Sequence, residues 1–489
     1  MERLGRKLMG LTDVGKERVL QFGAGGFLRA FVDWMLDIMN KEGSFDGSVV
    51  CVESFDKNIC QFLNEQDGLY TLYLRGVREG KQVLETRLIT SVSRCLSPED
   101  DYDEYMKLMS NSGLRFIVSN TTEAGIVYRA EDKLTDKPPA SFPAKVTALL
   151  YERFKIFGAD AQKGFIFIPC ELIDNNGDKL KEIVLQYAND WLLPVDFIDW
   201  VNSANYFTNT LVDRIVTGYP HKEAEKLTQE LGYQDKLMNT GEHFHFFAIE
   251  LPKNADASLA DELPLHKTGL NVIYSHDISP YKLRKVRILN GAHTMSVLAA
   301  FLSGYDTVLD MMQDEVFEKY LQQGIFDEII PTLNLEKDEL VSFANAVSDR
   351  FKNPYIEHFL ISIALNSVSK YKTRVLPSIL EYYNIKGKAP KLLTYSMAAL
   401  IAFYRGHSAN RGQYEIKDDA FVLEFFAQKY KQLNEGGADV QTLVDCCLAN
   451  EQFWGQDLTK LAGFSKLVAQ NLQQIFAEGA KQCLNKILQ

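Results

Sequence analysis

The sequence predicts a doubly wound α/β domain followed by a mainly α-helical domain. Three observations lead to this prediction. Short β-rich runs alternate with helical runs in the first part of the chain, which favours a parallel sheet covered by helices. From about residue 281 onward the pattern is almost entirely helical. The chain has 489 residues, more than one compact core usually holds, so two large domains are expected.

The predicted elements of the first domain follow in order. RVLQF (18–22) has the composition of a buried strand, and GFLRAFVDWMLDIMN (26–40) has the spacing of an amphipathic helix. SVVCVES (48–54) predicts a second strand. Further strand-like runs are RFIVSN (115–120), GFIFIPCE (164–171), FHFFAIE (244–250) and NVIYS (271–275). We therefore place the α/β domain at residues 1–275 and the helical domain at residues 276–489.

Charge and cysteine content limit the classes of partner. The formal net charge of −12 disfavours nucleic acid or an anionic membrane, which would require a basic surface. The N-terminus lacks the apolar core of a signal peptide, and no run reaches transmembrane length. The seven cysteines are odd in number and lack CxxC spacing, which is typical of reduced thiols. We expect a cytoplasmic protein with a small-molecule partner, and the pattern specifies no oligomeric state.

The run FGAGGF lies between the first predicted strand and the first predicted helix. Gly23 permits a tight turn, and Gly25 lets the backbone approach a pyrophosphate, as in the Rossmann dinucleotide fingerprint. The third glycine of that fingerprint is absent, because Leu28 stands at its position. A plain glycine turn is the alternative. We expect a dinucleotide site formed by Phe22, Gly23, Gly25, Gly26 and Phe27.

Glu53 ends the second predicted strand. An acidic side chain there can accept both ribose hydroxyls of a dinucleotide and repel a 2′-phosphate. A solvated strand end is the alternative, and Asp56, three residues on, could share the role. Together with the glycine run, Glu53 predicts NAD rather than NADP as the cofactor.

The run KVRILNGAHT carries Lys285, Asn290 and His293 inside an otherwise apolar helical pattern. On α-helical geometry the three side chains fall on one broad side. A lysine in a low-dielectric cleft can exchange a proton with a hydroxyl, an asparagine N–H can hold a developing alkoxide, and a histidine can orient the reacting group. The alternative is a snorkelling lysine, a capping asparagine and a satisfied core histidine. Beside a dinucleotide domain, the three residues predict hydride-transfer chemistry.

The spacing K-x4-N-x2-H resembles the signature of the polyol-specific long-chain dehydrogenases, the mannitol dehydrogenase family. Similar stretches extend over nearly the whole chain: FGAGGFLRAF (22–31), SNTTEAGI (119–126), TLVDRIVTGYP (210–220) and RFKNPYIEH (350–358). In that family the threonine–glutamate turn lies beside the cofactor. The resemblance therefore implies that Asn120 and Thr121 bind NAD.

The resemblance also implies roles for the catalytic residues. Lys285 becomes the general acid/base and His293 a substrate contact. Asn290 and Asn176 become an amide pair around the reacting oxygen. Asp213 is implied to lie near the lysine and the substrate. From the residues alone, Asn176 predicts a plain turn and Asp213 half of a helical charge pair.

The run PCELIDNNG (169–177) resembles the branch of the family that acts on a sugar acid, whereas the mannitol and mannonate branches typically read Asp-Asn-Leu at 171–173. The resemblance implies NADH-dependent reduction of D-tagaturonate to D-altronate in hexuronate breakdown. Ser362 replaces an arginine of the mannitol-oxidising members, so mannitol contacts cannot be copied. Reduction of fructuronate, another polyol activity of the family and a non-catalytic NADH sensor are the alternatives.

SKYKTRVLP gathers Lys370, Lys372 and Arg374 within five residues. Such a run is usually a solvated helix face. A sugar acid, however, requires a cation for its carboxylate, and the resemblance makes Lys370 a substrate contact. His243 and His245 form an HxH on a strand-like run without a third ligand of suitable spacing, so no metal is expected.

Overall fold

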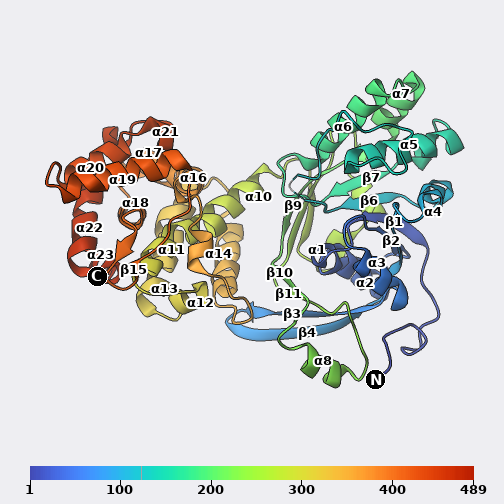
Figure 1. The fold of residues 1–489 in the computed structure, drawn as a ribbon, viewed down its shortest axis with the longest axis horizontal. Helices are drawn as coiled ribbons and strands as arrows, with labels where there is room; N and C mark the ends of the chain where they lie inside the picture. The colour runs from blue at the N-terminus through green and yellow to red at the C-terminus, as the bar shows by residue number, and fades with distance from the viewer. Residues whose placement is uncertain (123) are drawn as a thin grey trace. The chain divides into compact units, whose positions relative to one another are not determined.

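The computed structural model describes residues 1–122 and 124–489 (Figure 1). The chain divides into two compact units. The first comprises Met1–Arg75 and Val83–Ser279, and the second comprises Gly76–Gln82 and Pro280–Gln489. The first unit contains a parallel sheet with helices and the second is mainly helical, which confirms the predicted fold class.

A parallel sheet of six strands, as far as the structure describes the chain, forms the centre of the first unit. Its order is β5-β2-β1-β6-β7-β8. The strand order reverses between β1 and β6, and such a reversal opens a crevice at the carboxyl ends of the two strands. The strands are β1 (Glu17–Phe22), β2 (Ser48–Val52), β5 (Val92–Leu96), β6 (Phe116–Ser119), β7 (Ile166–Pro169) and β8 (Tyr206–Phe207).

Helices cover both faces of this sheet (Figure 1). Successive side chains of a strand point to opposite faces, so each strand contributes apolar side chains to a core on both sides. In β1, Val19 joins the core formed with one helical layer, and the next residue, Leu20, joins the core formed with the other. The first layer contains α2 (Val32–Glu42) and α3 (Lys57–Glu65), and the second contains α5 (Phe142–Phe157), α6 (Asn176–Asp190) and α7 (Val195–Ala204).

The helix predicted over residues 26–40 is interrupted. It consists of α1 (Gly26–Arg29) and α2, and Phe31 between them has φ −129° and ψ −82°, outside the helical region. The carbonyl of Arg29 accepts a hydrogen bond from the Tyr70 hydroxyl at 2.7 Å, and that of Ala30 accepts one from Arg214. Because distant side chains bind these carbonyls, the helix does not need to continue through them.

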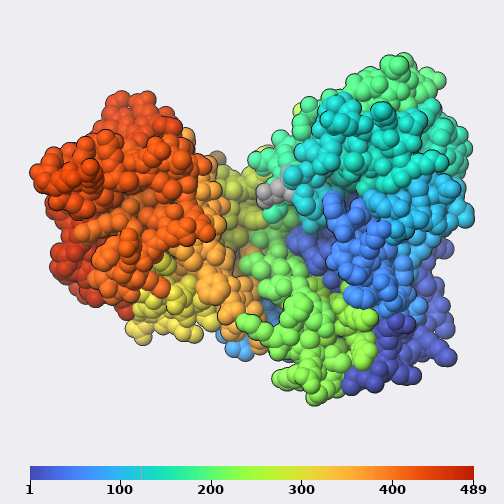
Figure 2. Space-filling model, viewed as in Figure 1, coloured from blue at the N-terminus to red at the C-terminus, as the bar shows by residue number. Residues whose placement is uncertain are grey.

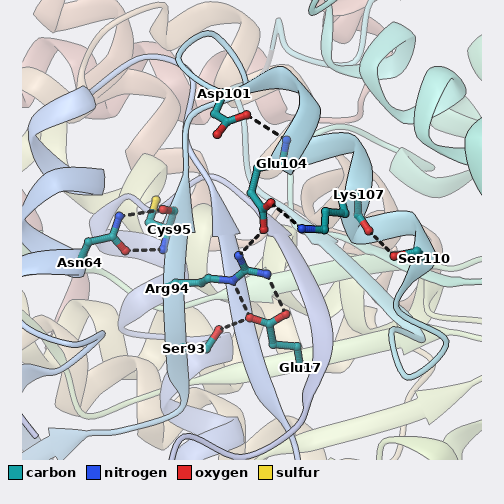
Figure 3. A network of polar contacts seen from close by, with 9 residues as sticks. All are labelled: Glu17, Asn64, Ser93, Arg94, Cys95, Asp101, Glu104, Lys107 and Ser110. Atoms are coloured by element: carbon teal, nitrogen blue, oxygen red, sulfur yellow. Dashed lines mark hydrogen bonds and ion pairs between the residues drawn. The ribbon is translucent and has the colours of Figure 1, made fainter.

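A polar network fixes the edge strand β5 to its neighbours (Figure 3). The Arg94 guanidinium contacts Glu17 of β1 at 2.8 Å and Glu104 of α4 (Tyr102–Lys107) at 3.1 Å. The Asn64 side chain of α3 exchanges two hydrogen bonds of 2.8 Å with the Cys95 backbone. These contacts join β5 to β1 and α4 and hold α3 against β5.

Two smaller sheets complete the first unit. The larger one contains a long hairpin, which was not predicted from the sequence. The tip of that hairpin belongs to the second unit, where the Glu79 N–H donates to the Asp349 carboxylate at 2.7 Å. One sheet contains β10 (Val216–Gly218), β11 (Asn239–Glu242), β3 (Tyr70–Arg78) and β4 (Lys81–Ile89), and the other β13 (Val272–Ser275), β12 (Phe246–Glu250) and β9 (Asn209–Asp213).

The N-terminal residues lie against the segment that follows α8 (Ala224–Leu231). The Leu4 N–H donates to the Gln234 carbonyl at 2.9 Å. Figure 2 shows the dark blue N-terminal residues beside this green segment. The first residues of the chain are therefore part of the first unit.

Two apolar helices form the core of the second unit. In α11 (Gly291–Leu302) every residue except His293 is buried, and in α18 (Lys391–Phe403) every residue except Lys391. They pack on each other, and α18 also packs on α22 (Phe464–Glu478). Around them lie α10 (Ser279–Arg284), α12 (Val308–Met312), α13 (Glu315–Gln323), α14 (Lys337–Phe351), α15 (Leu360–Ile363), α16 (Ser367–Arg374), α17 (Leu376–Lys386), α19 (Ala420–Asn434), α20 (Val440–Leu448), α21 (Glu451–Trp454) and α23 (Ala480–Leu488).

The segment that leads into α11 is a π-helix, η4 (Lys285–Asn290). The α-helical geometry that we assumed for this run is therefore wrong. A π-helix hydrogen-bonds each N–H five residues back and inserts residues into a helix without breaking it, often at a functional site. Over the residues that the structure describes, no helix is both long and apolar enough to cross a membrane.

Candidate active site

A cavity of about 480 Å³ opens in the first unit at the carboxyl ends of β1, β2 and β6. This is the strand-order reversal, where dinucleotides bind in doubly wound sheets. Six of the residues expected to bind the cofactor line the cavity: Phe22, Gly23, Gly25, Glu53, Asn120 and Thr121. Gly26 and Phe27, which were also expected there, lie in α1 and are not among the described lining residues.

The glycine turn has the shape that a pyrophosphate needs. Gly23 has φ +101°, which L-residues with a side chain rarely adopt, and a Cβ there would lie 3.0 Å from the Asn120 carbonyl oxygen. At Gly25 no atom lies within 4 Å of the position of a Cβ. The turn therefore leaves open space beside exposed backbone, and its residues fit a dinucleotide.

Glu53 lies against this turn and is only 7% exposed. One carboxylate oxygen accepts the Ala24 N–H at 2.9 Å, and the other accepts the Phe55 N–H at 2.9 Å and the Asp56 N–H at 3.3 Å. A carboxylate has about four acceptor positions, so about one remains for a ribose hydroxyl. Asp56 instead caps α3 by accepting the Asn58 N–H at 3.0 Å. Of the two acidic residues considered, Glu53 is the one that lines the cavity.

Glu171 fixes the turn after β6, a function that sequence reasoning missed. One of its oxygens accepts both the N–H and the hydroxyl of Thr121 at 3.0 Å, and the other accepts the Ser119 hydroxyl at 3.0 Å. The Asn120 side chain donates to the Cys170 carbonyl at 2.7 Å. Burial raises the pKa of the Glu171 carboxyl above its usual range. Cys170 and Glu171 thus hold the turn at residues 119–121 in place.

Asn176 is fully buried at the start of α6. Its side-chain NH₂ donates to the Pro169 carbonyl at 2.9 Å and to the Thr210 hydroxyl at 3.1 Å, and its oxygen accepts the Thr210 N–H at 2.9 Å. These bonds join α6 to β7 and β9. The role of Asn176 at a reacting oxygen stays a prediction, and the described contacts give it a structural function.

Asp213 is the last residue of β9, so the helical setting that the residues alone suggested for it is wrong. It lies opposite Phe246 of β12 and is 7% exposed. Its predicted role near the substrate stays a prediction.

Lys285, Asn290 and His293 all belong to the second unit, the first two at the ends of η4 and the third in the first turn of α11. All three are partly exposed in a segment whose other residues are mostly buried. The π-helix changes the angles between Lys285 and Asn290 from those of an α-helix.

The His293 imidazole stacks on Phe351 with ring centroids 4.0 Å apart and meets the His358 ring edge-on at 5.1 Å. Among the described residues its buried Nδ1 has no hydrogen-bond partner. Burial, with smaller contributions from His358, Arg350 and Arg374, holds the pKa of His293 well below its usual range. A neutral imidazole with a vacant buried nitrogen suits a hydroxyl-bearing ligand.

Lys370 lies in α16, which packs on η4 and on α11. Its ammonium donates to the Ile363 carbonyl at 3.0 Å, and two of its three N–H donors have no protein acceptor among the described residues. Burial and, to a smaller extent, Arg374 lower the pKa of Lys370. Lys372 is exposed, whereas Lys370 and Arg374 are half-buried. Of the three cations in this run, only Lys372 therefore lies on a solvated helix face.

His243 and His245 lie between β11 and β12 and outside both strands, so the expectation that they stand on a strand-like run is wrong. The Nε2 of His245 accepts the Asn271 N–H at 2.9 Å. In residues 1–122 and 124–489, no three His, Cys, Asp or Glu side chains gather as a group that could hold a metal ion.

Two family models match the chain. The Mannitol dehydrogenase Rossmann domain matches residues 17–261, and the Mannitol dehydrogenase C-terminal domain matches residues 277–476. The chain belongs to the mannitol dehydrogenase family. Among curated relatives of this family, altronate oxidoreductases of Escherichia coli O139:H28 and O9:H4 are each 49% identical over 472 residues, which is 96% of this chain and 97% of theirs.

Solved structures share the family fold. The Pseudomonas fluorescens mannitol 2-dehydrogenase in a ternary complex with NAD and D-mannitol matches 100% of this chain and 99% of its own, with a TM-score of 0.67 and 22% identity. A D-sorbitol dehydrogenase in substrate-free form matches 99% of this chain and 100% of its own, with a TM-score of 0.80 and 20% identity. At these identities the likeness concerns the fold.

Proposed function

We propose that the protein is an NAD-dependent altronate oxidoreductase, which reduces the ketone of D-tagaturonate to the secondary alcohol of D-altronate. The observation that carries this proposal is the 49% identity to altronate oxidoreductases over 96% of the chain. The cavity at the strand-order reversal supports it, because an oxidoreductase of this family needs a dinucleotide site there.

NAD(H) fits the residues of that cavity. The open turn at Gly25 would hold the pyrophosphate, and Glu53 would accept a ribose hydroxyl. The segment at Asn120 and Thr121, on the other side of the reversal from Glu53, would bind the other half of the dinucleotide. When bound, the nicotinamide supplies the hydride of the reaction.

Residues of the chain transfer the proton and stabilise the negative charge that develops on the substrate oxygen. Lys285 donates a proton to the ketone oxygen during reduction and takes it back in the reverse direction. The amide N–H of Asn290 stabilises the alkoxide as negative charge builds on oxygen. His293, kept neutral by burial, offers its vacant Nδ1 to a substrate hydroxyl.

The substrate's carboxylate distinguishes a sugar acid from a polyol. Half-buried Lys370 offers positive charge to a carboxylate, and Ser362, which stands where mannitol-oxidising members have an arginine, points away from mannitol. On the resemblance to the family, Asp213 would lie near the lysine and the substrate, and Asn176 near the reacting oxygen.

The direct test is the reverse reaction. The protein with NAD⁺ and D-altronate should produce NADH and tagaturonate, and the rate should depend on both. If NADH binds but neither altronate nor tagaturonate turns over, the proposed activity is wrong and a sensing role becomes the better account.

A further inference from the structure

Arg374 ends α16 directly against the segment that carries Asn290 and His293. A Cβ on Gly291 would lie 3.3 Å from the Arg374 carbonyl oxygen, so the two backbones are in close contact. The Arg374 guanidinium reaches the Thr294 hydroxyl at 3.5 Å. Arg374 therefore lies where the π-helix η4 joins α11. Its carbonyl is beside Gly291, and its guanidinium is beside Thr294.

The Arg374 guanidinium lacks the compensation that half-buried arginines normally have. The 3.5 Å contact to Thr294 is its one hydrogen bond, and no carboxylate pairs with it, among the residues that the structure describes. Burial alone lowers its pKa. Arg287 in η4 shows the contrast, because two hydroxyl oxygens accept its N–H groups at 2.7 and 2.9 Å. A partly buried cation without a counter-ion is unfavourable unless an anion binds to it.

A second observation independently indicates a ligand at this place. The Nδ1 of His293 is buried without a partner among the described residues, and His293 precedes Thr294, which Arg374 contacts. Among the described residues, a guanidinium without a counter-ion and an imidazole nitrogen without a hydrogen-bond partner thus lie at the same turn of α11. Lys370, one helical turn before Arg374, already donates to the Ile363 carbonyl and has Asp418 as an electrostatic partner.

We propose that the Arg374 guanidinium binds the carboxylate of the sugar-acid substrate, while Lys370 adds positive charge beside it. The proposal rests on the proposed function, because it requires an acidic substrate. The planar fork of an arginine matches a carboxylate through two parallel hydrogen bonds, which a lysine cannot reproduce. Arg374 thereby sets the preference for keto acids over neutral ketoses.

The test compares Arg374→Ala, Arg374→Lys and Lys372→Ala with the wild type. KM for tagaturonate, KM for NADH and kcat/KM for the neutral ketose fructose are measured for each, together with Tm. A charged hydrogen-bonded pair is worth about 1.5–3 kcal/mol, so Arg374→Ala should raise KM for tagaturonate on the order of 10- to 100-fold. KM for NADH and kcat/KM for fructose should stay near the wild-type values. Arg374→Lys should recover part of the loss, and exposed Lys372→Ala should behave as wild type.

The proposal is overturned if Arg374→Ala folds and leaves KM for tagaturonate unchanged, or if it weakens fructose and tagaturonate to the same extent. If Arg374→Ala does not fold, Arg374→Gln retains an N–H donor without the charge, and it should still raise KM for tagaturonate alone. A wild type that prefers fructose would refute the proposed function. A wild type that prefers tagaturonate, together with an Arg374→Ala variant of unchanged KM, would refute only the role of Arg374.

Discussion

The Glu171 carboxylate accepts two hydrogen bonds from Thr121, one from its N–H and one from its hydroxyl, although the residues are 50 positions apart. Thr121 lines the cavity proposed to bind the cofactor. Glu171 is 3% exposed and also accepts the Ser119 hydroxyl, so it holds both ends of the segment 119–121 in place. Glu171 therefore positions one wall of the cavity proposed to bind the cofactor.

Glu171→Ala should weaken cofactor binding. The change leaves the half-buried N–H and hydroxyl of Thr121 without their acceptor, at a cost of up to about 1–3 kcal/mol for each group. The Kd for NADH, followed by fluorescence titration, should rise roughly tenfold or more. Exposed Glu182 on α6 provides the matched control, because Glu182→Ala removes a carboxylate outside the cavity. An unchanged Kd in folded Glu171→Ala would show that the turn does not depend on this contact.

Glu171→Gln should keep cofactor binding near the wild-type value and should not lower Tm at neutral pH. Its carbonyl can accept from Thr121, and its NH₂ can donate to the Ser119 hydroxyl. Because burial raises the folded-state pKa of Glu171, the wild type loses stability as the pH rises from the usual carboxyl pKa through that raised pKa, and the loss is constant above it. The stability of Glu171→Gln minus that of the wild type should therefore rise over this pH range, which thermal unfolding at several pH values would measure. A variant that is destabilised more at higher pH would contradict this sign.

The wild type should use NADH with higher kcat/KM than NADPH. A 2′-phosphate beside the 7%-exposed Glu53 would bring like charges together in a partly buried site. Glu53→Gln should reduce the preference, because the repulsion is removed. Asp56→Asn is the matched control, since Asp56 caps α3 and asparagine also caps helices. Comparable efficiency with both cofactors in the wild type would refute the assignment of Glu53.

Lys285→Ala should bind NADH normally and lose turnover by about 10²–10⁴-fold, the range typical of acid–base groups. Single-turnover measurements would show that the loss lies in the chemical step rather than in cofactor binding. Lys372→Ala, an exposed lysine in α16, should turn over as the wild type does. Near wild-type turnover in Lys285→Ala at neutral pH would remove Lys285 from the mechanism.

Local sequence was enough for features that depend on neighbours in the chain. The β-rich composition of 18–22 and 48–54 predicted β1 and β2, and the glycine run predicted the turn between β1 and α1. The position of Glu53 at the end of β2 also followed, because strand ends share one edge of a parallel sheet.

Features that depend on distant contacts could not be predicted in this way. The break between α1 and α2 depends on Tyr70 and Arg214, which bind carbonyls at the break. Apolar spacing did not distinguish the π-helix η4 from an α-helix, since the two differ in hydrogen-bond register rather than in composition. Arg374 read as part of a solvated run, and only its packing against Gly291 and Thr294 sets it apart from Lys372.

The most direct test of the proposed activity compares D-tagaturonate, D-fructuronate and fructose at equal concentrations with NADH, following the loss of NADH absorbance. The wild type should show its highest kcat/KM with tagaturonate, a lower value with fructuronate and the lowest with fructose, which has no carboxylate. A higher kcat/KM with fructuronate would place the protein with the mannonate-forming enzymes of the family. A higher kcat/KM with fructose would contradict the sugar-acid assignment altogether.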